Sequence, residues 1–345
     1  MINRRLFDHY QIDTRKDLAI QNRCPRPFDT ILIDRQGSCY ACECQSWLPQ
    51  SIGNLRIKPL QEIIHSDMHR HLQESIDDGS YRYCNEHQCS YIRSGSVLHG
   101  GPRHVQHLRL AIDNSCNLRC PSCRKDMIFH KQGSAYRLAI GLADKINAWL
   151  HTYDHPVQVH IGSDGDPFAS HVYRHFMEHT PRRDDITYSI LTNALMFEEF
   201  HTRVPHVVKN LKELGVSIDG ATKHTYEQLR LGARWDKINE NLECIARLRK
   251  QNDFRFILHF VVQKDNFHEM EKIIDLGQHY GADRVWLNKI QDWGVMEDFA
   301  SQDIWQSHDY KKHLARVIQR IHERDDRFIE CPTLISEAVR HRNKN

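Results

Sequence analysis

Three closely spaced cysteines constrain this chain more than any other feature of its sequence. Cys116, Cys120 and Cys123 follow residues 108–112, whose alternation of apolar and polar side chains is typical of a strand. A structural zinc site takes four ligands, usually as two close pairs, whereas this stretch supplies three. Thiolates also hold iron–sulfur clusters, and three protein ligands on a 4Fe–4S cluster leave one iron open to bind another molecule. Zinc shared with a distant residue is the alternative that the spacing leaves open.

Length, charge and cysteine usage bound the class of protein. The 345 residues can bury a full core and predict one large domain plus a smaller one. A net charge of +2 gives no sign of a nucleic-acid partner. Without a long apolar run or a signal peptide, we expect a soluble, cytoplasmic protein with no membrane partner. Nine of the eleven cysteines lie between Cys24 and Cys123, which indicates metal ligands or reactive thiols rather than disulfides.

Beyond the breaker Gly100-Gly101-Pro102, the chain alternates between strand and helix patterns. The predicted strands are 106–112, 157–161, 187–191, 214–218, 255–262 and 284–288. The predicted helices are 136–151, 170–179, 198–213, 223–250, 267–280 and 309–324. Six strand-then-helix units predict an α/β fold, with a parallel sheet and helices outside it. Before the breaker, residues 30–44 predict a β-hairpin and residues 60–76 an amphipathic helix.

The cysteine triplet resembles the motif of the radical S-adenosylmethionine (SAM) enzymes, as do Asn114-Ser115 before it and Asn117-Leu118-Arg119 within it. The resemblance implies a partial (β/α)6 barrel over about residues 104–325. It also implies that Cys116, Cys120 and Cys123 hold a 4Fe–4S cluster whose open iron chelates the amino and carboxylate groups of SAM. A flavodoxin- or ferredoxin-type protein is then the expected electron donor.

The N-terminal part resembles the SPASM/twitch domain, a small α+β module that carries an auxiliary iron–sulfur cluster. Its features are matched, in order, by Cys24, Gly37, Cys42, Gly53-Asn54-Leu55, Cys84 and Cys89. The resemblance implies that these four cysteines hold one auxiliary 4Fe–4S cluster. Two departures from the pattern are that the module precedes the barrel and that its closing pair is spaced Cys-x4-Cys. Cys39 or Cys44 therefore remain as substitute ligands, and a zinc-bound hairpin remains as the alternative.

These resemblances predict three segments: an auxiliary-cluster domain at 1–100, the barrel at 101–325 and a tail at 326–345. Reactive groups in parallel α/β folds gather at the carboxyl ends of the strands. Several motifs of this sequence follow predicted strands and resemble SAM-contacting elements of the family. The residues are Gly165, Asp166, Pro167, Thr192, Asn193, Ser217, Asp219 and, in the next helix, Arg230. A tight turn, a helix cap and an exposed helix arginine are the plainer interpretations of these residues.

The family resemblance implies that SAM is reductively cleaved and that the 5′-deoxyadenosyl radical takes a hydrogen from an unactivated C–H bond. We expect oxidation or epimerisation of a small polar metabolite, such as a sugar or an aminocyclitol. Modification of a ribosomal peptide is the alternative, and a non-catalytic electron carrier or zinc scaffold is the alternative from another class. Epimerisation needs a hydrogen donor, for which Cys331 is the better candidate because Cys244 sits in a predicted helix.

Overall fold

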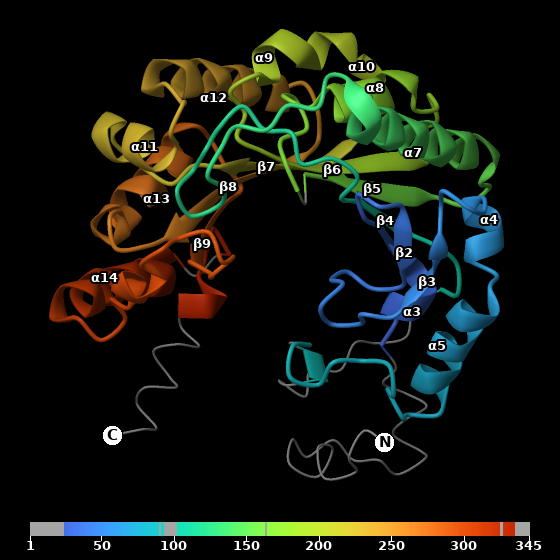
Figure 1. The fold of residues 1–345 in the computed structure, drawn as a ribbon. Helices are drawn as coiled ribbons and strands as arrows, with labels where there is room; N and C mark the ends of the chain where they lie inside the picture. Colours follow the sequence, from blue (N-terminus) through green and yellow to red (C-terminus); the bar gives the residue numbers. More distant parts are fainter. Residues whose placement is uncertain (1–23, 90, 93–101, 163, 325–326, 335–345) are drawn as a thin grey trace. The chain divides into compact units, whose positions relative to one another are not determined.

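The structure is a computed structural model that describes residues 24–89, 91–92, 102–162, 164–324 and 327–334 (Figure 1). Two compact units make up the chain, and each is described by itself. The first unit contains residues up to 114, 130–164 and 172–188. The second contains residues 115–129, 165–171 and 189 onward. The first unit runs across the predicted segment boundary at residue 100.

The strands are β1 (Thr30–Ile33), β2 (Ser38–Tyr40), β3 (Ser51–Asn54), β4 (His107–Leu110), β5 (Val157–Ile161), β6 (Ile186–Thr192), β7 (Leu211–Ser217), β8 (Arg255–Val262), β9 (Arg284–Lys289) and β10 (Ile329–Glu330). The α-helices are α3 (Arg26–Asp29), α4 (Leu60–Ile63), α5 (Asp67–Asp77), α7 (Gly133–Thr152), α8 (His171–His179), α9 (Phe197–Phe200), α10 (Pro205–Lys209), α11 (Lys223–Leu229), α12 (Trp235–Arg249), α13 (Met270–His279) and α14 (His308–Arg324). Short 3₁₀ helices are η1 (His201–Arg203), η2 (Phe267–Glu269) and η3 (Phe299–Gln302).

In the first unit, the strand order β5-β4-β1-β2-β3 joins parallel and antiparallel pairs. Strands β1 and β2 form the predicted hairpin, and β3 adds a third antiparallel strand. On its other side, β1 pairs in parallel with β4, which pairs in parallel with β5. Helix α5 packs through its apolar stripe, with Leu72 and Ile76 buried. The N-terminal module therefore shares its hydrogen-bonded ladder with the strand that leads to the cysteine triplet.

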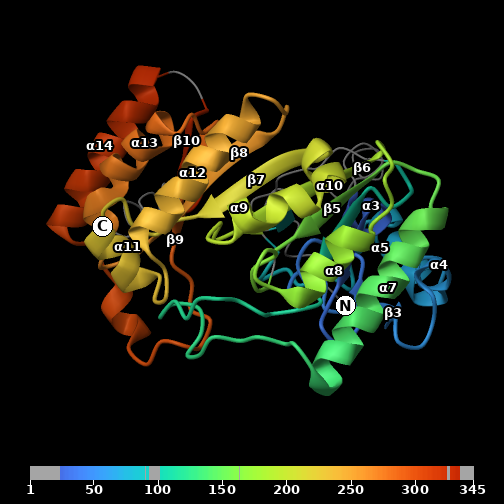
Figure 2. The ribbon, with the colours of Figure 1, turned by 90° about the horizontal axis from the view of Figure 1, so that it is seen from above.

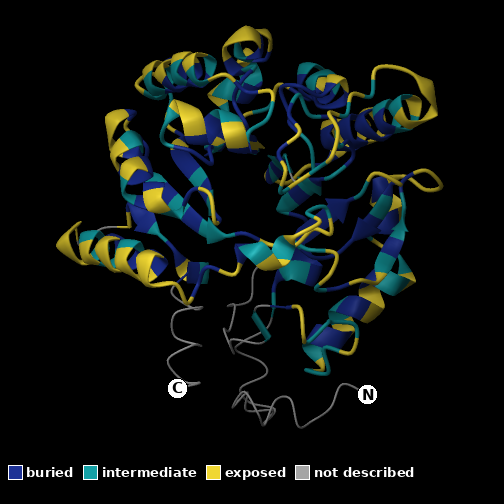
Figure 3. Cartoon of the chain, turned by 60° about the vertical axis from the view of Figure 1, so that its left-hand side comes forward, coloured by how far each residue is buried: buried dark blue, intermediate teal, exposed yellow. Residues whose placement is uncertain are grey.

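In the second unit, strands β7, β8, β9 and β10 pair in that order, and the pairs β7–β8, β8–β9 and β9–β10 are parallel. Helices α11 to α14 cover one face of these strands in both ribbon views (Figures 1 and 2). Side chains on the covered face are fully buried, among them Val216, Leu258 and Leu287. On the opposite face, Ser217, His259 and Trp286 are half-buried. Figure 3 shows the buried and more exposed parts of the chain. The predicted α/β class, with parallel strands and helices outside them, is confirmed.

The predicted helix over 198–213 is wrong at its C-terminal end. Helix α10 stops at Lys209, and Leu211 begins strand β7. Leu211-Lys212-Glu213-Leu214 suits a helix by propensity, but Glu213 pairs with Arg255 in the ladder and the two side chains form an ion pair at 2.8 Å. Tertiary pairing thus overrides local propensity.

The predicted helices over 223–250 and 60–76 are each two helices. The first ends at Leu229 and restarts at Trp235, because Gly232 adopts a left-handed φ of 99° that ends the helical path. The second breaks before Ser66, whose hydroxyl accepts a hydrogen bond from the His69 backbone N–H and caps α5. Within the described residues, no helix has the length and apolar character that crossing a membrane requires.

Candidate functional site

The loop that carries the cysteine triplet is held at three points in the second unit. The Cys116 N–H donates to Ile128 O at 2.7 Å, which closes the two ends of the loop. The Cys123 N–H donates to Cys120 O at 2.9 Å, so these two cysteines belong to one turn. The Arg119 N–H donates to Leu231 O at 3.1 Å, in the segment between helices α11 and α12. The sequence predicted one continuous helix here, and the segment that divides it in two binds the cysteine loop.

Cys120 interacts electrostatically with both Cys116 and Cys123, and the three thiols differ in burial. Cys120 is buried, Cys116 is half-buried and Cys123 is exposed. Burial raises the pKa of Cys116 to about 11, and the neighbouring Asp166 and Cys120 charges act in the same direction. Burial also raises the pKa of Cys120, with Cys123 adding to the effect. Three thiols in one loop suit an iron–sulfur cluster, whose irons displace the thiol protons on binding. Within the described part of the chain, no three His, Cys, Asp or Glu side chains converge as ligands of one metal ion.

Asp166 organises the two strand-end motifs beside the loop. Its Oδ2 accepts hydrogen bonds from Thr192 Oγ1 and the Asn193 N–H, both at 2.7 Å. Its Oδ1 accepts from the backbone N–H groups of Phe168 and Ala169, at 3.1 and 3.0 Å. Its own N–H donates to Ser115 O at 2.8 Å. The carboxylate is thus committed to the protein, so the part of this motif left to meet a ligand is its backbone around Gly165 and Pro167.

Asn193 connects the end of β6 with the cysteine loop. Its Nδ2 donates to Asn117 Oδ1 at 2.8 Å and lies 3.8 Å from Cys116 Sγ. Its Oδ1 accepts from the Leu195 N–H at 3.0 Å. Both polar atoms of the Asn193 side chain are therefore hydrogen-bonded, and the side chain holds the loop in place next to Cys116. Thr192 and Asn193 lie at the end of β6 and are bonded within the protein, and their predicted contact with SAM stays a prediction.

Asp219 and Arg230 form a buried ion pair beside Cys120. Asp219 Oδ2 lies 2.9 Å from Arg230 Nε, and Asp219 Oδ1 accepts from the Val261 N–H at 2.9 Å. Arg230 Nη1 lies 4.0 Å from Cys120 Sγ. Burial opposes the charged guanidinium, but Asp219 and Cys120 outweigh it and raise the Arg230 pKa. Arg230 has its carboxylate partner within this chain, and its predicted contact with the SAM carboxylate stays a prediction.

Two residues that sequence reasoning missed hold the Ser217-Ile218-Asp219-Gly220 turn. Glu269 is 2% exposed and accepts from the Ala221 N–H and from both Thr222 and Thr225 hydroxyls. Asn266 Nδ2 donates to Asp219 O at 3.0 Å. Both come from the start of the next strand–helix unit, more than forty positions away, so no local pattern marks them. Gly220 is required here because a Cβ would lie 2.3 Å from the Tyr226 backbone nitrogen.

A row of side chains crosses the half-buried face of the same strands. Ser217 is in register with His259, and His259 with Trp286. The His259 and Trp286 rings stack with centroids 5.5 Å apart and an interplanar angle of 25°. Trp286 Nε1 has no hydrogen-bond partner among the described residues. The row presents an uncharged aromatic surface next to Ser217, the residue predicted to contact SAM.

We expect His259 to make the second unit sensitive to acid. Burial lowers its pKa to about 4, below the ordinary value of 6.5. The unfolded chain therefore takes up a proton first, and stability falls as the pH drops from about 6.5 to about 4, by about 3 kcal/mol in total. Urea unfolding at a series of pH values should show this slope, and His259→Gln should flatten it. The control is His87→Gln, at a ring that is 82% exposed; equal slopes in all three proteins would refute the assignment.

In the first unit, Cys24, Cys42, Cys84 and Cys89 lie close enough to act on one another's titration. Burial raises the pKa of Cys24 to about 11 and that of Cys42 to about 12, and Cys89 adds to both shifts. Burial also raises the pKa of Cys84, and the other three thiols add to it. The four cysteines predicted as auxiliary ligands are thus near enough to influence one another, and their role as ligands stays a prediction. Four thiols suit a cluster in which every iron is held by protein.

Two further contacts and one uncommon backbone conformation accompany this group of thiols. The Arg26 guanidinium forms an ion pair with Glu43, which ties the segment after Cys24 to the residue after Cys42. Tyr81 has a left-handed φ of 45°, an uncommon backbone conformation for a bulky residue. Burial raises the pKa of its hydroxyl to about 12, and the backbone of Cys24 hydrogen-bonds to that hydroxyl. None of these contacts has a signature in the sequence.

The remaining cysteines lie elsewhere. The Cys39 thiol contacts Gly37 O at 3.7 Å, and burial followed by the Asp34 charge raises its pKa to about 12. Cys44 Sγ contacts Ser46 Oγ at 3.0 Å. No other cysteine contributes to the Cys39 shift, and Cys39 does not contribute to the shifts of Cys24, Cys42 or Cys84. The backbone of Cys44 hydrogen-bonds to the Cys42 thiol and lowers its pKa.

Cys331 follows β10, whose residue Glu330 is in register with Trp286. Because side chains alternate along a strand, Cys331 follows on the opposite, helix-covered side, where it is 2% exposed. Burial raises its pKa to about 11, so the thiol keeps its proton. Cys244 is buried in α12. The role of Cys331 as hydrogen donor stays a prediction.

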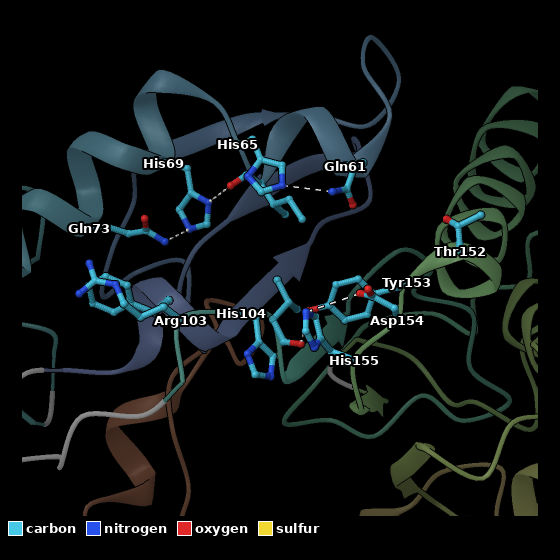
Figure 4. A pocket seen from close by; sticks show the side chains of 13 residues that line it. Gln61, His65, His69, Gln73, Arg103, His104, Thr152, Tyr153, Asp154 and His155 are labelled. Atoms are coloured by element: carbon cyan, nitrogen blue, oxygen red, sulfur yellow. Dashed lines mark hydrogen bonds and ion pairs between the residues drawn. The ribbon is translucent and has the colours of Figure 1, made fainter.

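A cavity of about 570 Å³ lies at the amino ends of β4 and β5 in the first unit (Figure 4). Its polar groups are bonded to the protein itself. His69 has its ring nitrogens 2.7 Å from the carbonyl oxygens of Ile64 and Pro27, and the Tyr153 hydroxyl donates to Val105 O. Parallel α/β folds react at the other end of their strands. This cavity is therefore not the candidate site.

Two family models match the chain. Residues 111–277 match the radical SAM superfamily, and residues 24–90 match the SPASM model, an iron–sulfur cluster-binding domain. The chain thus carries a radical SAM domain and an iron–sulfur SPASM domain. Its SPASM domain precedes its radical SAM domain, as the sequence predicted. These domains imply a SAM-binding 4Fe–4S cluster, an auxiliary cluster and SAM itself, and the two groups of thiols fit them.

No curated protein matches the radical SAM chain in sequence. Among solved structures, SuiB from Streptococcus suis is 13% identical with a TM-score of 0.46, over 79% of this chain and 59% of that one. AdoMet-bound anSMEcpe is 15% identical with a TM-score of 0.47, over 65% of this chain and 64% of that one. TsrM from Kitasatospora setae, a radical SAM methyltransferase, is 11% identical with a TM-score of 0.37, over 56% and 37%. The chain thus spans less than two thirds of the length of each.

Proposed function

We propose that this radical SAM protein reductively cleaves SAM and uses the 5′-deoxyadenosyl radical to take a hydrogen atom from an unactivated C–H bond of its substrate. The observation that carries the proposal is the group of three interacting thiols at Cys116, Cys120 and Cys123, enclosed by strand-end motifs. When bound, the cluster supplies the electron for cleavage and the open iron that chelates SAM. Cofactors of this kind carry the difficult chemistry, and the protein provides binding, orientation and exclusion of water.

The chain's own residues have distinct tasks in this proposal. Asp166 holds the Gly165–Pro167 backbone and the Thr192-Asn193 pair against the loop. Asn193 orients the loop beside Cys116, and the Asp219–Arg230 pair places a positive charge near Cys120. Ser217 is proposed to meet the bound SAM from the end of β7. Fixed, pre-oriented groups of this kind favour one geometry of the reacting atoms.

The auxiliary cluster, held by Cys24, Cys42, Cys84 and Cys89, is proposed to serve electron transfer. We further propose an acidic one-electron carrier of the flavodoxin or ferredoxin type as the donor. Two substrate classes belong to the proposal: a peptide and a small polar metabolite. The peptide is to be tested first, since SuiB has been solved with its precursor peptide SuiA and anSMEcpe with the peptide Cp18Cys.

The test is anaerobic iron and sulfide analysis, followed by a SAM-cleavage assay after chemical reduction. We expect about eight irons per chain, four for each cubane, and formation of 5′-deoxyadenosine. Hydrogen–deuterium exchange with candidate peptides and metabolites would then separate the two substrate classes. Zinc in place of iron, without 5′-deoxyadenosine, would mean that the cysteines are structural and that the proposal is wrong.

A further inference from the structure

We propose that the Tyr226 hydroxyl donates a hydrogen bond to the sulfur of Cys120 when that sulfur is a cluster ligand, and that this bond raises the reduction potential of the SAM-binding cluster. The inference rests on the proposed function, because it assumes that Cys120 ligates the cluster. Tyr226 is then a residue that tunes the cluster without touching substrate.

The buried hydroxyl of Tyr226 has no hydrogen-bond partner among the described residues. The side chain is 0% exposed, and its oxygen makes no hydrogen bond to any described residue. Buried tyrosine hydroxyls nearly always find a hydrogen-bond partner, because leaving one unpaired costs about 1–3 kcal/mol. The missing acceptor is therefore expected to arrive with something that the site binds.

The helix geometry directs Tyr226 toward the cysteine loop. Tyr226 and Arg230 are four residues apart, and the Arg230 N–H donates to Tyr226 O at 2.8 Å, so their side chains leave the same face of α11. From that face, Arg230 Nη1 comes within 4.0 Å of Cys120 Sγ. A tyrosine hydroxyl carries its proton at neutral pH, so it can donate a hydrogen bond.

Of the acceptors near this face of α11, Cys120 has the most free capacity. Asp219 uses one oxygen for the Val261 N–H and the other for Arg230. Asp166 accepts four hydrogen bonds, two on each oxygen. Among the described residues, the Cys120 sulfur has only the long contact to Arg230. A neutral thiol is a weak acceptor, whereas a thiolate is a strong one, which explains why the bond forms only with a bound cluster.

Such a bond changes the cluster's electron affinity in a known direction. Reduction adds negative charge to the cluster, and a hydrogen bond to a ligating sulfur stabilises that charge. Removing the bond should therefore make the cluster harder to reduce. We expect the ratio of reduced to oxidised cluster at a fixed potential to fall about tenfold, which corresponds to about 59 mV for a one-electron couple.

The experiment is a potentiometric titration of the reconstituted holoenzyme, followed by electron paramagnetic resonance, with Tyr226→Phe compared with the wild type. The signal that changes when SAM is added identifies the SAM-binding cluster. Tyr280→Phe is the matched control, since its hydroxyl donates to Asn239 Oδ1 at 2.7 Å in the same unit. We expect the midpoint to fall by about 59 mV in Tyr226→Phe alone, at unchanged iron content.

Three other outcomes have distinct meanings. Iron loading equal to wild type with an unchanged midpoint in Tyr226→Phe overturns the inference and leaves the proposed function intact. A wild-type protein that binds no iron defeats the proposed function itself. Should Tyr226→Phe fail to fold, 3,5-difluorotyrosine incorporated at position 226 alone provides the second measurement. Its more acidic phenol donates more strongly, so the midpoint should rise, and an unchanged midpoint overturns the inference.

Discussion

Cys120→Ala is expected to abolish SAM cleavage and to lower the iron content from about eight to about four per chain. Cys120 is the buried member of the triplet, and its thiol is coupled to Cys116 and Cys123 on either side. Two remaining thiols cannot hold a cubane that also needs an open iron for SAM. The measurements are iron and sulfide analysis and chromatography of 5′-deoxyadenosine after chemical reduction.

Two other cysteines provide the controls for this loss. Cys244→Ala removes a buried thiol from α12 in the same unit, and Cys39→Ala removes one from β2. Both variants should keep about eight irons and full SAM cleavage, because neither thiol belongs to a cluster group. Equal losses in Cys39→Ala and Cys120→Ala would contradict the division of the cysteines into ligands and non-ligands.

Asp166→Asn is expected to have the second-largest effect, through loss of both SAM binding and stability. The carboxylate accepts four hydrogen bonds, from Thr192, Asn193, Phe168 and Ala169. An asparagine keeps one oxygen and must turn its NH₂ group toward two of these donors, which leaves the Asn193 N–H without an acceptor. Hydrogen bonds to charged groups contribute about 1.5–3 kcal/mol each, so the free energy of unfolding should fall by about 3 kcal/mol.

The structure offers a matched control two residues earlier in the chain. Asp164 pairs with Arg35 at 3.1 Å at a site where both side chains are more than a third exposed. Such surface pairs contribute little, so Asp164→Asn should change stability by less than about 1 kcal/mol and leave SAM affinity unchanged. Urea unfolding and equilibrium dialysis of labelled SAM against the reconstituted holoenzyme measure the two effects. An Asp166→Asn protein with wild-type SAM affinity would show that Asp166 does not organise the site.

The sequence predicted the fold class and the positions of the strands because both depend on local periodicity. Strands β5 and β8 have the predicted bounds, and β4, β6 and β9 differ by at most three residues at either end. The helix ends were predicted less accurately, because they depend on contacts with distant residues. Arg255 draws Glu213 into a strand, and the cysteine loop requires the break at Gly232.

The resemblance of short motifs to the radical SAM and SPASM families predicted the two groups of cysteines. The same resemblance assigned the strand-end residues to SAM. It could not foresee that Asp166 and Asp219 direct their carboxylates to the protein, because three of their partners, Thr192, Asn193 and Val261, lie 26 to 42 positions away in the chain. Asn266 and Glu269 were missed for the same reason.

The sequence by itself thus determined the class of fold, the family and the candidate ligands, all of which are written in short-range patterns. Only the tertiary structure decided which thiols meet, which polar groups are already bonded and which one, the Tyr226 hydroxyl, still lacks an acceptor. Hydrogen-bond satisfaction is a property of atoms that folding brings together from distant positions, and no local pattern of residues encodes it.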